Sequence, residues 1–364
     1  MNREFYNRLS DCAAAGDALP RETALEILSS DRIDLMPLVS AAYAVRKKFF
    51  GNKVTIHVIN NAQNGYCPED CHYCAQAKSS TANIEAYAMK SDREFFDEAK
   101  AAYDSGAYRY CMVFSGRGPS QQRVEHLARL IREIKQRYPI QVCVSAGLLD
   151  QTKARMLKDA GLDRLNHNLN TSARHYPKIC STHTYEDRLT TLSAAQQAGL
   201  QICSGVILGM EETADDVWEM AETTRKMEVE SIPVNFFIPI DGVQLKAQPK
   251  LSPEYCLRAL CLYRFMNPRA EIRIAAGREI HLRSMEVMAL FPANSLFLDG
   301  YLNAKGEERL RTLQMIKDAG FTIESDHSLD GLIEKMASVT QAPKIEMKNF
   351  NDLHPEIHAL TKKK

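Results

Sequence analysis

Residues 65–76 have the sequence GYCPEDCHYCAQ, and this stretch does most to decide the fold and the chemistry of the chain. Its cysteines, Cys67, Cys71 and Cys74, are separated by three and then by two residues, so one short loop can turn all three thiols to the same side. A cubane [4Fe-4S] cluster normally takes four thiolates. Three thiols therefore predict a [4Fe-4S] cluster with one iron left open for a further ligand.

The alternative use of such thiols is a structural zinc site. Zinc sites usually pair cysteines as C-x-x-C and take a second pair from further along the chain. The three cysteines here are consecutive, and no second C-x-x-C exists in the sequence. The spacing therefore favours an iron–sulfur cluster over zinc.

Around this loop, short β-rich segments alternate with longer amphipathic segments. Eight strands with helices between them are typical of a parallel (β/α)₈ TIM-type barrel rather than of a doubly wound sheet. We expect strands at Val54–Asn61, Tyr108–Phe114, Gln141–Gly147, Arg164–Asn170, Gln201–Gly209, Ser231–Ile240, Glu271–Gly277 and Ser295–Leu302. We expect helices at Gln121–Arg137, Tyr185–Ala198, Ala214–Lys226, Pro253–Phe265 and Glu307–Ala319.

The chain has 364 residues, a length at which an α/β barrel is commonly a single domain. We expect residues 1–50 to form helices packed on the barrel, residues 51–320 to form the barrel domain, and residues 321–364 to form a C-terminal extension. From about Ser338 this extension is polar and ends in three lysines, which predicts a loosely held tail.

The composition is that of an ordinary globular protein, with 45% hydrophobic and 25% charged residues. The 46 basic and 46 acidic side chains cancel, which gives no electrostatic reason to expect binding to nucleic acid or to a membrane. No signal peptide or membrane span is recognisable, so we expect a cytoplasmic protein. In a reducing compartment, metal ligation explains ten cysteines better than disulfides do.

Three further cysteines lie inside three different expected strands. Cys111, Cys143 and Cys203 have this position, and Arg273 has the corresponding place in a fourth strand. Side chains that point into a closed barrel form layers contributed by different strands, so these four can meet near the axis. Each cysteine alone is explained as a buried apolar thiol. A buried guanidinium is costly without negative charge, however, so together the four predict a second iron–sulfur cluster.

Seven blocks of the sequence resemble the biotin synthase family of the radical S-adenosylmethionine (SAM) superfamily. In chain order they are CPEDCHYCAQ, YCMVFSGRGPS, DRLNHNLNTS, THTYEDR, CSGVILGMEET, ESIPVNF and RIAAGRE. Tyr73 also completes the Cys-x-x-x-Cys-x-aromatic-Cys pattern of the superfamily. The resemblance extends from about residue 35 to residue 320, which covers the whole expected barrel.

The resemblance implies a [4Fe-4S] cluster, a [2Fe-2S] cluster and S-adenosyl-L-methionine as cofactors. The [4Fe-4S] cluster would be held by Cys67, Cys71 and Cys74, and the [2Fe-2S] cluster by Cys111, Cys143, Cys203 and Arg273. The matching SAM contacts are Tyr73, Ser115, Gly116, Asn168, Asn170, Arg188, Ile207 and Gly209. The matching substrate contacts are Asn168 and Asn235.

Several of these residues have ordinary explanations without the resemblance. Arg188 would be a solvated helix arginine, whereas the family pairs this position with the methionine carboxylate of SAM. Asn168 and Asn170 are two apart on one expected strand and hence share a face, where amides suit ribose hydroxyls and a ureido group. His167 lies between them and is expected to point away as a hydrogen-bonded histidine behind the site.

The implied activity is the conversion of dethiobiotin to biotin by a sulfurtransferase of the radical SAM class. Cleavage of SAM gives a 5′-deoxyadenosyl radical that abstracts hydrogen at two carbons, and the second cluster donates the sulfur. The resemblance also implies a flavodoxin or ferredoxin as electron donor and a homodimer. Two alternatives are a related barrel enzyme, such as a hydrogenase maturase or an aminomutase-like enzyme, and a non-catalytic iron–sulfur carrier or sensor. The strand cysteines with Arg273 argue against the first, and the open iron and long barrel against the second.

Cys180 departs from the family pattern, in which other members often have a different residue at this position. We expect a loop thiol without a role. The alternative is a position near the second cluster, where Cys180 would change the composition of that cluster.

Overall fold

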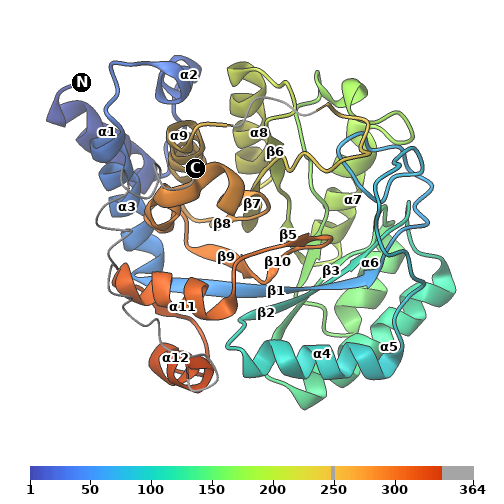
Figure 1. Ribbon diagram of the computed structural model, residues 1–364. Helices are drawn as coiled ribbons and strands as arrows, with labels where there is room; N and C mark the ends of the chain where they lie inside the picture. The colour runs from blue at the N-terminus through green and yellow to red at the C-terminus, as the bar shows by residue number, and fades with distance from the viewer. Residues whose placement is uncertain (247–250, 338–364) are drawn as a thin grey trace, which may run out of the picture.

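The computed structural model describes residues 1–246 and 251–337. Three helices come first, α1 (Arg3–Ala15), α2 (Arg21–Ser29) and α3 (Leu35–Phe50), and they pack against α9 (Pro253–Met266) at one side of the molecule (Figure 1). The expected tail from Ser338 lies outside the described residues.

Eight parallel strands form a closed barrel, which confirms the expected (β/α)₈ fold. The order is β1-β2-β3-β4-β5-β7-β8-β9, and β9 pairs back with β1 to close the ring, while the short β6 pairs with β7. The strands are β1 (Lys53–Gln63), β2 (Arg109–Phe114), β3 (Gln141–Ser145), β4 (Arg164–Asn166), β5 (Gln201–Cys203), β6 (Val206–Leu208), β7 (Ser231–Phe236), β8 (Glu271–Ile274) and β9 (Ser295–Leu298).

Helices surround the barrel because each has one apolar face. In α5, Val124, Leu127, Ile131 and Ile134 recur every three or four residues and are fully buried, while the other face is charged. The helices outside the strands are α4 (Asp92–Asp104), α5 (Gln121–Arg137), α6 (Gln151–Asp159), α7 (Tyr185–Gln197), α8 (Ala214–Lys226), α10 (Arg278–Leu282), α11 (Arg309–Asp318) and α12 (Leu329–Ala337), with 3₁₀ helices η1 (Tyr176–Lys178) and η2 (Arg283–Leu290).

The expected strand Gln201–Gly209 is interrupted, and β5 and β6 flank the break. The N–H of Gly205 donates to Oδ1 of Asn168 (2.9 Å) instead of to a neighbouring strand. The backbone at Gly205 also approaches β7 so closely that a Cβ would lie 2.4 Å from the carbonyl oxygen of Pro233. A side-chain amide therefore replaces a ladder bond here, which the sequence pattern did not indicate.

The strand expected at Arg164–Asn170 ends earlier, at Asn166. Asn170 has φ +68°, a left-handed conformation that asparagine tolerates better than most residues, and it forms an isolated bridge with Val206. The premise that Asn168 and Asn170 share one strand face is therefore wrong. The chain turns inward at this point instead.

Beyond the last barrel strand, the chain folds back over the ring. A hairpin of β10 (Gly300–Tyr301) and β11 (Ala304–Lys305) follows β9 at once. Then β12 (Thr322–Ile323) pairs in parallel with the start of β1. The division of the chain at residues 50 and 320 stays a prediction. Across the described residues, no helix has the length and apolarity needed to cross a membrane.

Candidate active site

The loop after β1 is fixed by backbone hydrogen bonds to segments distant in sequence. The N–H of His72 donates to the carbonyl of Ile179, and the carbonyl of His72 accepts from Leu245 N–H, each at 2.9 Å. At the start of the loop, Gly65 N–H donates to the side-chain oxygen of Gln76 (3.2 Å). The loop contains no helix or strand, so these bonds determine its position.

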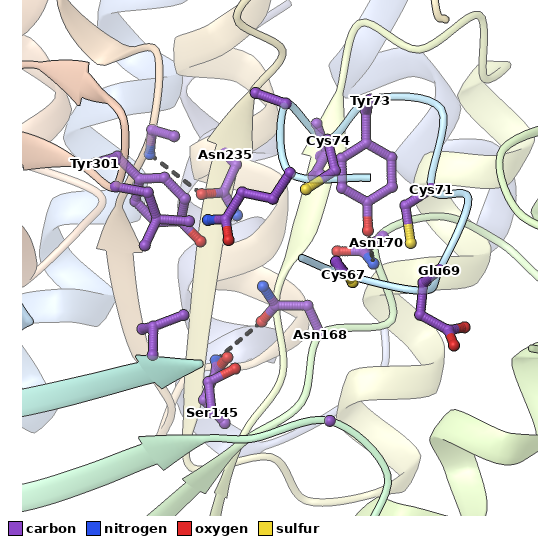
Figure 2. A pocket seen from close by; sticks show the side chains of 18 of the residues that line it. Cys67, Glu69, Cys71, Tyr73, Cys74, Ser145, Asn168, Asn170, Asn235 and Tyr301 are labelled. Atoms are coloured by element: carbon purple, nitrogen blue, oxygen red, sulfur yellow. Dashed lines mark hydrogen bonds between the residues drawn. The ribbon is translucent and has the colours of Figure 1, made fainter. Parts of the chain in front are cut away.

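The three cysteines of this loop line one large cavity at the mouth of the barrel (Figure 2). The cavity encloses about 1410 Å³ including its open side, with apolar walls that include Phe236, Phe237 and Tyr301. Seven of the residues matched by the resemblance line the same cavity: Tyr73, Gly116, Asn168, Asn170, Arg188, Ile207 and Asn235.

The donor set at the mouth fits a cluster held by three thiolates. Cys67, Cys71 and Cys74 are all partly buried, and thiolate is the ligand type that iron–sulfur clusters require. Burial raises the pKa of Cys67 and of Cys74, and the contact with Cys180, together with burial, raises the pKa of Cys71. The thiols are thus neutral before metal binds, and ligation displaces their protons.

Arg188 crosses behind the loop and is held by three acceptors. It donates to the carbonyl of Asn168 (2.8 Å), to Nε2 of His183 (2.7 Å) and to the hydroxyl of Tyr176. Burial opposes its charge, but the phenols of Tyr73 and Tyr176 outweigh burial and raise its pKa. The residue is buried, not solvated as its helix position alone would suggest.

Hydrogen bonds to backbone and side-chain groups fix Asn168 and Asn170 in the cavity. Oδ1 of Asn168 accepts from Asn166 (3.0 Å) and Gly205 (2.9 Å), which turns its amide nitrogen toward the cavity (Figure 2). Nδ2 of Asn170 donates to the hydroxyl of Tyr73 (2.6 Å), so the residue before the third cysteine is tied to the barrel.

Asn235 has a structural part as well. Its Nδ2 donates to the carbonyl of Val206 (2.9 Å), and its Oδ1 accepts from Ala276 N–H (3.2 Å). Nδ2 also donates to the carbonyl of Pro233 (3.4 Å), so one side chain joins β6, β7 and the end of β8 at the cavity wall.

Two expected SAM contacts stay predictions, and one expected orientation differs from the structure. Ser115 and Gly209 are outside the cavity lining: the Ser115 hydroxyl donates to the carbonyl of Gly65 (2.5 Å), and Gly209 N–H donates to Glu212 (2.8 Å). His167 is buried, but it lines the cavity and does not point away from it as expected, and among the described residues its Nε2 has no hydrogen-bond partner. Burial, with Arg188 and His183 nearby, lowers its pKa well below the usual value, so it is neutral.

The strand cysteines meet deeper in the barrel, and we call the site formed by Cys111, Cys143, Cys203 and Arg273 the floor. Cys111 on β2 lies directly opposite Cys143 on β3, and both line a small cavity of about 360 Å³ together with Arg273. Cys203 is not part of that lining, but its sulfur is 3.8 Å from Nη1 of Arg273 and 3.2 Å from Nδ2 of Asn166. All four residues are at most 5% exposed.

A carboxylate that the sequence analysis missed lies beneath them. Glu271 accepts from Arg164 (2.9 Å), Arg109 (3.4 Å) and Arg273, and its Oε1 is 3.0 Å from Nε2 of His57. Burial alone would raise the pKa of Glu271, but the surrounding cations and His57 hold it well below its usual value. Among the described residues, Arg273 therefore has one carboxylate partner, Glu271.

Charge in the barrel floor nevertheless remains unbalanced. Three guanidiniums share the single carboxylate of Glu271, and burial lowers the pKa of His57 so that it stays neutral. An uncompensated buried charge costs several kcal/mol unless an anion meets it. The floor therefore fits a negatively charged group on the three thiols.

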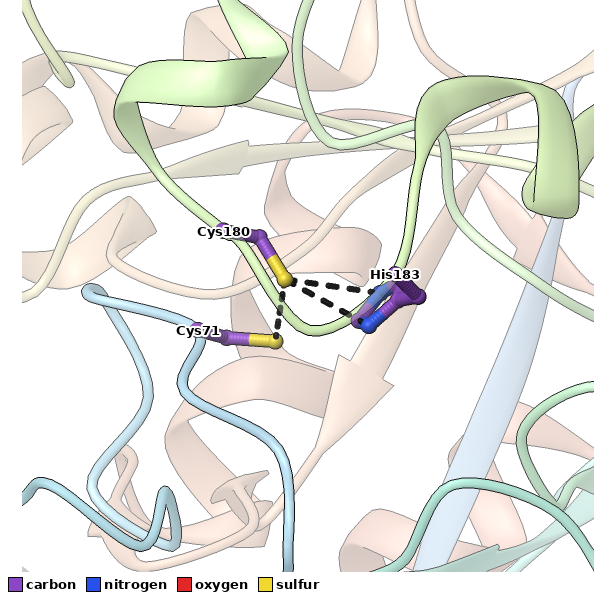
Figure 3. A group of neighbouring side chains, drawn as sticks. All are labelled: Cys71, Cys180 and His183. Carbon is purple, nitrogen blue, oxygen red and sulfur yellow. Dashed lines mark hydrogen bonds between the residues drawn. The ribbon is translucent and has the colours of Figure 1, made fainter.

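Cys180 contacts the loop at the mouth and not the floor. Its sulfur is 3.9 Å from that of Cys71, 3.4 Å from Nδ1 of His183 and 3.3 Å from Asp70 (Figure 3). The hydrogen bond with Cys71, outweighing burial, lowers its pKa to about 4. The alternative position near the second cluster is therefore wrong.

Glu69 was also missed. It accepts from Nδ1 of His183 (2.5 Å) and from the hydroxyl of Thr182 (2.7 Å), which joins the cysteine loop to the segment after η1. Glu69 and Asp70 lie between Cys67 and Cys71 in the sequence. Two acidic residues between two expected metal ligands were the sequence feature that could have indicated this contact.

Comparison with known proteins agrees with this geometry. Residues 64–224 match the Radical SAM superfamily, and residues 233–322 match the Biotin and Thiamin Synthesis associated domain. Fold and site thus define a radical SAM barrel enzyme. Among solved structures, a methylornithine synthase (TM-score 0.75, 19% identity, 89% of this chain and 98% of that one) and an FeFe-hydrogenase maturase from Carboxydothermus hydrogenoformans (TM-score 0.73, 18% identity, 90% and 81%) share this fold.

Sequence relatives narrow the class further. The chain is 54% identical to a biotin synthase of Magnetococcus marinus over 87% of this chain and 98% of the relative. It is 53% identical to one of Acaryochloris marina (86% and 91%) and 44% identical to one of Bacillus subtilis (88% and 96%). The chain belongs to the biotin synthase family.

Proposed function

We propose that this chain carries out the sulfur insertion of its family, the conversion of dethiobiotin to biotin. The two sets of cysteines in the barrel act as separate cluster sites. Cys67, Cys71 and Cys74 hold a [4Fe-4S] cluster at the mouth. Cys111, Cys143 and Cys203, with Arg273, hold a [2Fe-2S] cluster at the floor. The observation that carries this assignment is the charge imbalance around Glu271, which an anionic cluster on the floor thiols offsets.

The cavity between the two sites is the place we propose for SAM and dethiobiotin. Arg188 faces the cavity next to the cysteine loop, where its guanidinium can pair with the methionine carboxylate. Asn170 and Ile207 line the wall toward the nucleoside, and Asn168 and Asn235 offer amides to the ureido group. Gly116 lines the cavity as well, whereas Ser115 and Gly209 act on SAM at most through the backbone they support.

The chain's own part in the chemistry is to bind, orient and exclude water. When bound, the mouth cluster with SAM supplies one-electron reduction and a hydrogen-abstracting carbon radical, and the floor cluster supplies sulfur. Asn170 holds Tyr73, and with it the cysteine loop, at a fixed position relative to the barrel. Phe236, Phe237 and Tyr301 form apolar walls that keep water from a reactive radical.

Three further features of the family are part of this proposal. Electrons come from a flavodoxin or a ferredoxin, the protein acts as a homodimer, and it works in the cytoplasm. The partly buried loop that carries Cys67, Cys71 and Cys74 is where an electron donor would approach, since it lies at the open side of the cavity.

The test is anaerobic reconstitution followed by mass spectrometry of the products. Wild type, Cys143→Ala and the control Cys261→Ala, a buried thiol of α9 outside both sites, receive SAM, reductant and dethiobiotin. We expect biotin and 5′-deoxyadenosine from wild type and control, and 5′-deoxyadenosine without biotin from Cys143→Ala. Deoxyadenosine without biotin from wild type would contradict the substrate, and biotin at the wild-type yield from Cys143→Ala would contradict the floor as sulfur donor.

A further inference from the structure

The mouth contains a fourth thiol that the proposed chemistry does not use. Sγ of Cys180 lies 3.9 Å from Sγ of Cys71, and both side chains point toward each other across the gap between two segments (Figure 3). Cys180 is buried, with 3% of its surface exposed. Two free thiols at this separation are in contact without being bonded.

Both segments can bring the sulfurs together. Cys71 and Cys180 lie outside helices and strands, Cys180 just after the short helix η1. The backbones are already joined beside the two thiols, because His72 N–H donates to the carbonyl of Ile179 (2.9 Å). A disulfide needs an S–S distance of about 2.05 Å, so the two sulfurs must approach by roughly 2 Å.

We propose that Cys71 and Cys180 form a disulfide when the protein lacks its mouth cluster and meets a hydroperoxide. The peroxide takes two electrons from the pair: one S–S bond forms and the O–O bond breaks. With protons from the thiols and the solvent, the oxygens leave as two waters from hydrogen peroxide, or as water and an alcohol from an alkyl hydroperoxide. A hydroperoxide is therefore reduced as the thiols are oxidised, and a dithiol reductant reverses the step.

Cys111 and Cys143 also lie opposite each other, but they differ in one respect. They stand on β2 and β3, whose ladder holds the strands at a fixed spacing. Cys71 and Cys180 stand on loop segments that are joined by the backbone bond from His72 to Ile179 and not by a strand ladder, so we expect oxidation at the mouth first.

The consequence, which rests on the proposed function, is protection of a cluster ligand. A free thiol can be oxidised beyond the reversible stage to sulfinic and sulfonic acids, whereas a disulfide can be reduced again. The bond would keep Cys71 recoverable while it prevents cluster assembly, so assembly would require prior reduction.

Disulfide mapping on the full-length, cluster-free chain tests the bond itself. The protein is stripped with a chelator, reduced, freed of reductant, treated with hydrogen peroxide, alkylated under denaturing conditions and digested without reductant. We expect the Cys71 and Cys180 peptides to be linked, with a mass two hydrogens below the sum of the two thiol peptides. Cys180→Ser should abolish the link, and the control Cys261→Ser should keep it.

Three results would overturn the proposal: alkylation of both Cys71 and Cys180 after oxidation, a link from Cys71 to another cysteine, or over-oxidation of Cys71 at equal rates in wild type and Cys180→Ser. A metal ion held by Cys71, Cys180 and His183 in place of a disulfide would give the first result, because denaturation releases the ion. Mapping needs no catalytic activity, so its outcome is separate from that of the proposed function. As a second readout, reductant should restore iron uptake to oxidised wild type, whereas oxidised Cys180→Ser should not regain it, because its Cys71 is oxidised beyond the reversible stage.

Discussion

The mouth and the floor of this barrel build thiol sites in two different ways. At the mouth, three cysteines come from eight consecutive residues of a loop and are partly buried. At the floor, three cysteines and Arg273 come from four strands, β2, β3, β5 and β8, and are almost completely buried among charges. A loop site can be lost without loss of the fold, whereas a site made by strand register and buried charge is part of what the fold must satisfy.

The sharpest separation of the two sites comes from Cys74→Ala. Because the mouth cluster loses one of three ligands, we expect complete loss of 5′-deoxyadenosine and biotin with the floor cluster retained. Iron and sulfide analysis with electron paramagnetic resonance, alongside product detection, checks this. If Cys74→Ala still cleaves SAM at the wild-type rate, the loop is not the primary cluster site.

The charges at the floor should contribute to the free energy of unfolding. Glu271→Gln removes the one carboxylate among three buried arginines, so we expect the cluster-free protein to lose about 3–5 kcal/mol of unfolding free energy. Denaturant unfolding measures it.

The matched control for the floor is Glu254→Gln, whose carboxylate pairs with Arg258 near the surface and should cost at most about 1 kcal/mol. If the two substitutions lower the unfolding free energy equally, the buried charges of the floor contribute no more to stability than a surface ion pair does.

A smaller effect is expected from Arg188→Lys at the mouth. Lysine keeps the charge but not the planar fork, so we expect about a tenfold weaker affinity for SAM, which corresponds to about 1.4 kcal/mol. Equilibrium binding of SAM to the reconstituted protein measures it. Arg225→Lys, at an exposed position that bonds Gly16, is the control. Unchanged SAM affinity would remove Arg188 from the proposed contacts.

The smallest effect concerns the hairpin over the mouth. Asn64 and Asn303 exchange two amide hydrogen bonds (2.8 and 3.1 Å), which tie the end of β1 to the hairpin of β10 and β11. Asn303→Ala should lower the free energy needed to open residues 300–305 by about 1 kcal/mol. Amide hydrogen exchange in these residues should therefore be faster. Amides of β8 serve as the internal control, and faster exchange there too would mean that mouth and floor open together.

The same contrast explains what the sequence could predict. The cysteine loop could be predicted from the spacing of its cysteines, and the barrel from the alternation of strand and helix segments. Both patterns can be recognised in short stretches of sequence. The positions of Cys111, Cys143 and Cys203 on separate strands were predictable, because strand assignment needs only the local pattern. Their approach to Arg273 follows once the barrel is closed.

Other features depend on contacts between residues that are far apart in the sequence, so no short stretch of sequence indicates them. Glu271 lies two residues before Arg273 in the sequence, but its pairing with Arg109 and Arg164 exists only in the closed ring. Cys180 meets Cys71 because a loop bond at Ile179 joins two segments far apart in the chain. The early end of β4 depends on the left-handed turn at Asn170, for which the strand pattern gave no indication.

The seam between β1 and β9 has a consequence for biosynthesis. Thr55 pairs with Ser295, so the ring cannot close until nearly the whole chain has left the ribosome. Such distant pairing is slow and leaves strand edges open meanwhile. The floor thiols of β2, β3 and β5 therefore emerge and wait as a nascent, unfinished sheet, and the cell must keep them reduced and unaggregated until the last strand arrives.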